Sequence, residues 1–140
     1  MFSDYEEKVP ELAWAAGFFD GEGSTFLSRQ KVVHYDRPGR PAYRANSPSL
    51  SIAQVDRRPL DRWVAVIGVG TVRGPYKPRT KNSRSYYRVE LRGRIRSHRA
   101  LVQMWPYMSK PKKEQAHHVW AEAEGLRTKK SPPLPRLPEY

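Results

Sequence analysis

The sequence predicts a single α+β domain in which a helix, two strands, a helix, two strands and two helices follow one another. Its length of 140 residues suits one hydrophobic core, and no internal repeat divides it. Several short stretches alternate polar and apolar residues with a period of two, and glycine, proline or polar residues bound them, which is typical of antiparallel strands. We therefore expect a four-stranded antiparallel sheet with the helices on its apolar face.

Local signals predict where these elements begin and end. A helix begins near Pro10, because proline suits a first helical turn, and Gly21 and Gly23 end it. A stretch rich in proline and glycine around residues 37–41 predicts a long hairpin loop. The other elements are expected as strands at 24–33, 47–55, within 67–77 and at 85–92, and as helices at about 58–66, 95–104 and 112–124.

The domain is expected to occupy residues 1–125, and the proline-rich residues 126–140 are expected to form a loosely held C-terminal tail. The chain contains no cysteine, which excludes disulfides, zinc–thiolate sites and thiol nucleophiles. No apolar run approaches the roughly 20 residues that cross a bilayer, and the acidic N-terminus is unlike a signal peptide. We therefore expect a soluble protein of the cytoplasm, nucleoid or an organelle that is not secreted and has no membrane partner.

Charge is distributed unevenly along the chain. Residues 1–24 carry six acids and one base, residues 25–113 carry 21 bases and four acids, and residues 114–140 carry four of each, so that the net charge of +12 comes from the middle block. Such a block indicates a polyanionic partner, because basic groups release the counterions condensed on phosphates. Composition alone leaves DNA and RNA open, and general solubility or a ribosomal type of RNA binding would give a similar balance.

One face of the expected sheet is polar and basic. Leu50 and Ile52 face the helices, and the residues of opposite strand parity face away from them. A β-surface of this kind can read base edges in a major groove, where arginine pairs with guanine and glutamine with adenine. A solvated sheet face is the ordinary alternative, and a register slip of one residue would exchange the two sets. The side chains expected to contact DNA are Phe26, Ser28, Gln30, Ser49, Ser51, Arg73, Tyr86, Arg88 and Glu90.

The end of the first helix carries the most specific motif. Ala13, Ala16 and Gly17 have i, i+3, i+4 spacing, which leaves one helical stripe nearly free of side chains, so that a second helix backbone can approach closely. Two acids follow where the chain leaves the helix through glycines. The segment AAGFFDGEG at 15–23 closely resembles the nine-residue motif of the LAGLIDADG homing endonucleases in its GFIDGEG form. This resemblance implies that family's αββαββα fold, in which the sheet forms a DNA-binding saddle.

The resemblance also implies a metal site. Glu22 occupies the position of the family's metal-ligand acid, with Gly21 beside it, and Asp20 matches an acid with a structural role at the dimer interface. In the family, two such helices cross and bring two carboxylates together, which repel unless a cation lies between them; Mg²⁺ prefers oxygen ligands of this kind. Two or three divalent ions are expected at the dimer centre, and Ca²⁺ is expected to bind without supporting cleavage.

Further family positions are matched beyond the motif, over most of residues 9–125. Gln54 matches a polar residue that helps to order water beside the metals. Arg58 and Lys112 match a basic pocket around the nucleophilic water or the scissile phosphate, although each base is almost equally well explained as a plain phosphate contact. Nearby bases remain alternatives to these two, namely Arg57, Lys110 and Lys113.

One motif provides one acid, whereas the chemistry of the family uses two. The resemblance therefore implies a two-fold homodimer whose interface contains Ala13, Ala16, Gly17 and Asp20, and a nearly palindromic target. It implies a Mg²⁺-dependent endonuclease that cuts double-stranded DNA and leaves 3′ overhangs. An intron maturase on the same fold, with RNA as its partner, a non-cutting DNA-binding relative and an unrelated basic RNA-binding protein are the alternatives.

Overall fold

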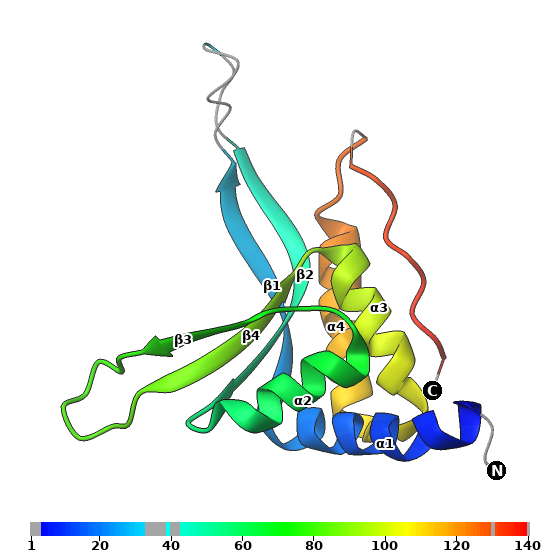
Figure 1. Ribbon diagram of the computed structural model, residues 1–140. Coiled ribbons are helices and arrows are strands. Elements are labelled where there is room, and N and C mark those ends of the chain that lie inside the picture. Colours follow the sequence, from blue (N-terminus) through cyan, green and yellow to red (C-terminus); the bar gives the residue numbers. More distant parts are fainter. Residues whose placement is uncertain (1–3, 33–38, 40–42, 130, 140) are drawn as a thin grey trace.

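The computed structural model of the chain describes residues 4–32, 39, 43–129 and 131–139 (Figure 1). The expected order of elements is confirmed. It runs α1 (Asp4–Glu22), β1 (Gly23–Val32), β2 (Tyr43–Gln54), α2 (Arg57–Ile67), β3 (Val72–Tyr76), β4 (Tyr86–Arg92), α3 (Arg94–Met104), the 3-10 helix η1 (Trp105–Tyr107) and α4 (Lys110–Gly125).

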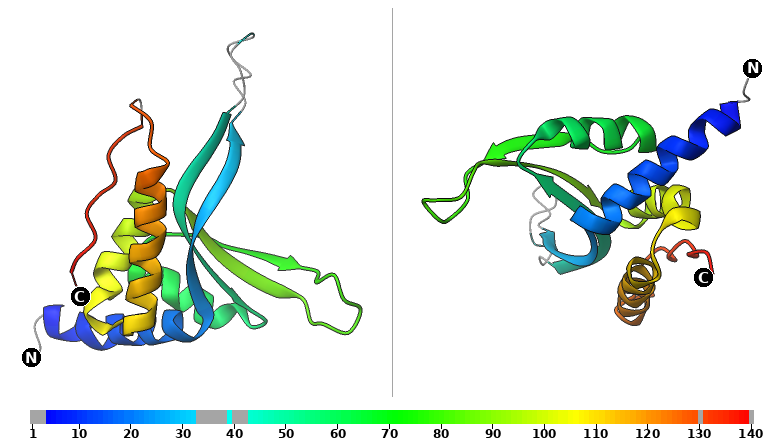
Figure 2. Two further views of the ribbon diagram at one scale, coloured as in Figure 1. Left: turned by 180° about the vertical axis from the view of Figure 1, so that it is seen from behind. Right: turned by 90° about the horizontal axis from the view of Figure 1, so that it is seen from below.

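The four strands form one antiparallel sheet in the order β1-β2-β4-β3. The helices gather on one side of this sheet, and the β1–β2 and β3–β4 hairpins extend beyond them in different directions (Figures 1 and 2). The sheet face away from the helices is therefore bounded by two projecting hairpins.

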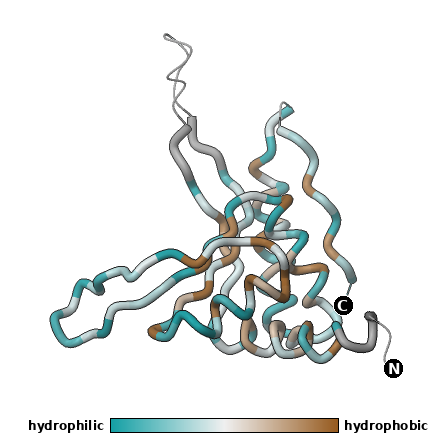
Figure 3. Tube along the Cα trace, viewed as in Figure 1, coloured by the Kyte–Doolittle hydropathy of each residue, from teal (hydrophilic) through white to brown (hydrophobic). Residues whose placement is uncertain are grey.

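The expected strand parity is confirmed, and it places the core between sheet and helices. Leu50 pairs with Leu91 and Ile52 with Val89, and these four side chains are buried. Trp63 of α2 and residues of α1 and α3 fill the space behind them. Hydrophobic residues gather where the helices meet the sheet, whereas the loop of the β3–β4 hairpin is hydrophilic (Figure 3). Because only one face of the sheet is buried, a shift of one residue would expose the core side chains, and this determines the strand register.

Helix α1 is longer than expected. It begins at Asp4 rather than near Pro10, so that this proline lies inside the helix, where its ring is exposed. Among the helices in the described parts of the chain, none is long and apolar enough to cross a lipid bilayer.

The C-terminal segment is packed against the helices, and the expectation of a loosely held tail is wrong. Leu137 is only 6% exposed and belongs to the core. A proline-rich segment forms no internal backbone hydrogen bonds, so that its carbonyl groups can accept hydrogen bonds from elsewhere. Four of these carbonyl groups accept hydrogen bonds from ring N–H groups of the helices. These bonds join His98 to the carbonyl of Arg136 (2.8 Å), Trp105 to Glu139 (3.0 Å), His117 to Pro138 (3.0 Å) and Trp120 to Pro135 (2.9 Å).

Candidate active site

The junction of α1 and β1 forms a tight corner around Gly23. A Cβ atom on Gly23 would lie 2.2 Å from Cδ2 of Phe19, whose side chain is fully buried, so that only glycine fits here. Glu22 precedes the corner with an exposed side chain that makes no hydrogen bond or ion pair within the described ranges. The carboxylate is therefore presented to solvent at a fixed point of the fold.

Helix α4 holds this corner from a distance of about ninety residues in sequence. Lys112 donates a hydrogen bond from Nζ to the carbonyl oxygen of Gly23. One turn later, Gln115 accepts a hydrogen bond from the backbone N–H of Thr25 (3.1 Å). Lys112 thus contacts the residue that follows Glu22. Gln115, which was not predicted to take part in the site, holds the start of β1 in place.

The lysines beside Lys112 have other surroundings. Lys110 is exposed and lies 3.9 Å from the carboxylate of Glu114. Lys113 lies over the ring of Trp105, on the side of α4 that the C-terminal segment covers. Of the three lysines, Lys112 is the one that contacts the corner beside Glu22.

Asp20 is occupied within its own chain. Its carboxylate accepts hydrogen bonds from the backbone N–H (3.0 and 3.1 Å) and the hydroxyl (3.2 Å) of Ser109, the residue before α4. It therefore joins the end of α1 to the start of α4, which agrees with a structural role for this acid and accounts for it without a second chain.

Gln54 is the last residue of β2 and lies at the same end of the sheet as the corner at Gly23. Gly23 pairs with Ile52, and Gln54 follows two residues later on the same face, opposite Tyr87 of β4. Its side chain is half-buried. The sheet register thus brings this amide to the end of the sheet at which Glu22 and Lys112 lie.

The two arginines that begin α2 are engaged with acids of their own helix end. Arg57 pairs with Asp61 (3.0 Å) and lies over the ring of Tyr87, the cross-strand partner of Gln54. Arg58 binds Asp56, the N-cap residue of α2, with its side chain (2.6 Å) and its backbone N–H (2.9 Å). No described contact joins either guanidinium to Glu22.

These pairs shift the pKa of the groups involved. Hydrogen bonds from the side chain and then the backbone of Arg58 lower the pKa of Asp56 from 3.8 to about 2. The hydrogen bonds to Asp61 and Asp56 raise the pKa of Arg57 and Arg58 respectively. Both arginines remain cationic at every physiological pH, and each binds its carboxylate through Nε and Nη2.

A stripe of small residues runs along the exposed side of α1, but its membership differs from expectation. Ala13, Gly17 and Gly21 are exposed at i, i+4, i+8 spacing, and a Cβ atom on Gly17 would meet nothing within 4 Å. Ala16, expected at the interface, is fully buried in the core of its own chain. A second helix can approach the stripe of Ala13, Gly17 and Gly21, but not Ala16.

The sheet face away from the helices carries aligned polar side chains. The pairing of the strands sets them in three rows, which consist of Phe26 with Ser49 and Arg92, Ser24 with Ser51 and Glu90, and Ala53 with Arg88 and Arg73. These side chains point away from the helices as expected, but they are not all exposed to solvent. Ser49 has no exposed surface and bonds to the carbonyl of Ser47, and Ser28 is only 9% exposed. Neither presents its hydroxyl to a partner here. The side chain of Gln30 lies outside the described residues.

Arg88 is the most constrained base on this face. Its guanidinium lies over the rings of Tyr86 (5.6 Å) and Tyr76 (6.0 Å), and these two rings are themselves 5.6 Å apart. Its Nε is buried and has no hydrogen-bond partner among the described residues. A guanidinium held against two aromatic rings is preorganised for planar hydrogen bonding.

The oxygen donors at the corner fit a divalent cation. Glu22 supplies an unpaired carboxylate, and the last carbonyl groups of α1, including that of Gly21, lack partners within the helix. Oxygen ligands at the negative end of a helix dipole suit Mg²⁺ or Ca²⁺. The described residues of one chain bring no three of histidine, cysteine, aspartate and glutamate together.

Comparison with known proteins identifies the fold. No protein-family model and no curated protein matches the sequence. The homing endonuclease I-CvuI, crystallised with the I-CreI target, matches with a TM-score of 0.58 and 24% identity, over 86% of this chain and 69% of that one.

Two further solved structures share the architecture. The LAGLIDADG homing endonuclease I-GzeII, in complex with its DNA target, matches with a TM-score of 0.56 and 14% identity over 85% of this chain, which spans 38% of that protein. The homing endonuclease I-TnaI matches with a TM-score of 0.51 and 20% identity, over 84% of this chain and 88% of that one. The order of elements, the sheet and these matches together show that the chain has the LAGLIDADG homing endonuclease fold.

Proposed function

We propose that the protein is a site-specific, Mg²⁺-dependent homing endonuclease that acts as a homodimer on a long, nearly palindromic DNA site and leaves 3′ overhangs. The observation that carries this proposal is the contact of Lys112 with the carbonyl of Gly23. This contact brings the ammonium group of Lys112 to the residue next to Glu22, although α4 and the end of α1 are far apart in sequence. A fold that needed only a stable corner would not require an exposed carboxylate at this point.

Each residue of the corner has a defined task in this proposal. Glu22 and the carbonyl of Gly21 hold the cation, which would supply the Lewis acidity that phosphodiester hydrolysis requires. Lys112 places positive charge beside the phosphate that is cut. Gln54 offers an amide to order the attacking water. Either Arg57 or Arg58 turns from its carboxylate to the DNA backbone on binding.

DNA is the favoured partner because the polar sheet face lies between two projecting hairpins. The loop of the β3–β4 hairpin alone carries Lys77, Arg79, Lys81 and Arg84, all exposed. Solved structures of the same fold contain DNA, and that of I-CvuI was determined both with Mg and with Ca. We propose Phe26, Ser51, Tyr86, Arg88 and Glu90 as base-edge contacts, and Gln30 remains in this set.

A homodimer follows from the supply of one acid per chain. Two copies of α1 packed along Ala13, Gly17 and Gly21 would bring both Glu22 side chains to the two-fold axis. The stripe has no Cβ atom that would hold two helix backbones apart except that of Ala13. A symmetric protein then requires a nearly symmetric target.

Replacement of the proposed metal ligand tests this function. Glu22→Gln should bind DNA with nearly unchanged affinity and lose double-strand cleavage, because the neutral amide holds a divalent cation poorly. Glu124→Gln is the matched control: this exposed acid lies at the far end of α4, pairs with Arg127 and should leave cleavage intact. Cleavage of supercoiled plasmid and gel-shift binding are measured in parallel. Normal cutting by Glu22→Gln would refute the assignment of the metal ligand.

The alternatives give different results with the wild-type protein. Tight binding of duplex DNA without cutting in Mg²⁺ would indicate a DNA-binding relative that lacks activity. Preference for intron RNA, together with faster splicing, would indicate a maturase.

A further inference from the structure

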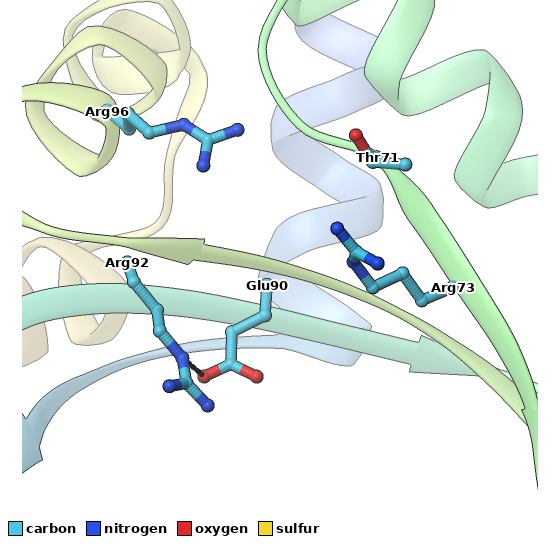
Figure 4. Close-up of a pocket in the computed structure, with 5 residues that line it drawn as sticks. All are labelled: Thr71, Arg73, Glu90, Arg92 and Arg96. Atoms are coloured by element: carbon cyan, nitrogen blue, oxygen red, sulfur yellow. Dashed lines mark hydrogen bonds and ion pairs between the residues drawn. The ribbon is translucent and has the colours of Figure 1, made fainter. Parts of the chain in front are cut away.

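A basic hollow lies at the margin of the sheet, away from the corner of Glu22. Its volume is about 300 Å³. Strands β3 and β4 and the first turn of α3 meet here. The hollow is lined by Thr71, Arg73, Glu90, Arg92 and Arg96 (Figure 4).

The three arginines of this hollow are not equivalent. Arg92 pairs with Glu90 at 2.7 Å, so that these two charges cancel. Arg73 and Arg96 make no ion pair or hydrogen bond with any other described residue. Figure 4 shows their guanidinium groups pointing into the same space, from β3 and α3 respectively. The hollow therefore contains two uncompensated positive charges that face one another.

Two facing cations repel one another, and an anion between them removes that repulsion. A guanidinium presents two parallel N–H groups, which match two oxygens of a phosphate. Thr71 adds an exposed hydroxyl at the rim. The carboxylate of Glu90 is already bound by Arg92, so that it does not neutralise the pair. The chemistry of the hollow is therefore that of a phosphate site.

We propose that this hollow binds one phosphate group of the DNA backbone, held between Arg73 and Arg96, at the margin of the proposed DNA-binding face. The inference rests on the proposed function. It changes the role of Arg73, which strand parity assigned to base reading. The guanidinium of Arg73 turns toward α3 in Figure 4, whereas that of Arg88 lies against the rings of Tyr86 and Tyr76.

The two roles differ in a measurable way. An arginine that contacts a phosphate contributes to affinity for every sequence and to its salt dependence, whereas one that contacts a base edge discriminates between sequences. Each phosphate contact adds about 0.9 to the slope of log affinity against log salt concentration. Because a homodimer has two hollows, a variant that loses the contact should reduce the slope by about 1.8.

Salt-dependent binding of duplexes of mixed sequence tests the proposal with Arg73→Gln, Arg96→Gln and the wild-type protein. Between about 50 and 200 mM salt, each variant should lose about tenfold less affinity than the wild type. Arg99→Gln is the matched control, since Arg99 is exposed on the same helix one turn after Arg96 and does not line the hollow. All three substitutions are expected to fold, because none of these side chains is buried.

Equal slopes for Arg96→Gln and Arg99→Gln would overturn the proposal, because the effect would then be one of net charge. Loss of discrimination at one base pair in Arg73→Gln, with an unchanged slope, would return this residue to base reading. If inorganic phosphate stabilised the wild type against heat but not Arg96→Gln, while DNA slopes stayed equal, the hollow would hold a free anion instead. A wild-type protein that bound no duplex would refute the proposed function itself.

Discussion

The corner at Gly23 leaves no room for a side chain, and this predicts a large effect of one methyl group. A Cβ atom would lie 2.2 Å from Cδ2 and 2.5 Å from Cε2 of Phe19, and that ring is fully buried, so that it cannot swing into solvent. Overpacking of this kind costs about 1–3 kcal/mol. Since 1 kcal/mol shifts the melting temperature of a domain of this size by about 2–4 °C, Gly23→Ala should melt about 2–12 °C below the wild type.

The control is Gly125→Ala, at the end of α4. A Cβ atom there meets nothing within 4 Å, so that the same substitution should be neutral or should raise stability by up to about 1 kcal/mol. Calorimetry of both variants gives the comparison. A double mutant isolates the cause. In a protein that already carries Phe19→Leu and so lacks the ring, Gly23→Ala should lower the melting temperature by less. Equal melting of the Gly23 and Gly125 variants, or an unchanged cost without the ring, would refute the packing argument.

Three further predictions concern other parts of the molecule. Gly17→Ala should strengthen the isolated helix by about 0.5–1 kcal/mol but raise the dissociation constant of the proposed homodimer about tenfold or more in sedimentation equilibrium. An unchanged constant would remove α1 from the proposed interface. Leu137→Ala should lower the free energy of unfolding in urea by about 2–5 kcal/mol, and an unchanged midpoint would mean a loose tail. The Asp56 carboxyl should titrate near pH 2 by NMR, and nearer 3.8 in Arg58→Gln. Because folding lowers this pKa, the cap contributes fully above about pH 4 and is lost as the pH falls toward 2.

Local periodicity predicted the sheet well because one of its faces is buried. Leu50 and Ile52 could not exchange faces with Ser49 and Ser51 without exposing the core, and the register followed from that. The contact of Gln115 with Thr25 was not predicted, although Gln115 lies one turn after Lys112 on the same side of α4.

Contacts between distant segments were beyond such reasoning. Ala16 and Gly17 are adjacent small residues, and only the packing of α1 against its own domain decides that one is buried and the other exposed. The C-terminal segment looked unstructured because its prolines form no periodic pattern. Its order comes from Leu137 and from ring N–H groups donated by helices that precede it in sequence.

Exposure of individual polar side chains also required the structure. Strand parity placed Ser49 on the outer face correctly, but its side chain has no exposed surface and its hydroxyl bonds to the carbonyl of Ser47. Arg73 lies on a strand and Arg96 on a helix, and both line one hollow. The periodicity of either element alone could not have predicted that the two side chains lie close together. Sequence reasoning thus gave faces and spacings, and the fold supplied the distances between them.

We propose that two copies of this chain cut double-stranded DNA with the aid of a divalent metal. This proposal is tested most directly by incubating the purified protein with a randomised duplex library in Mg²⁺, in Ca²⁺ and in EDTA, and sequencing the cut ends. Double-strand cuts with 3′ overhangs are expected in Mg²⁺ alone, centred on a nearly palindromic site. Intact duplexes in Mg²⁺ despite tight binding, or cuts that persist in EDTA, would contradict it.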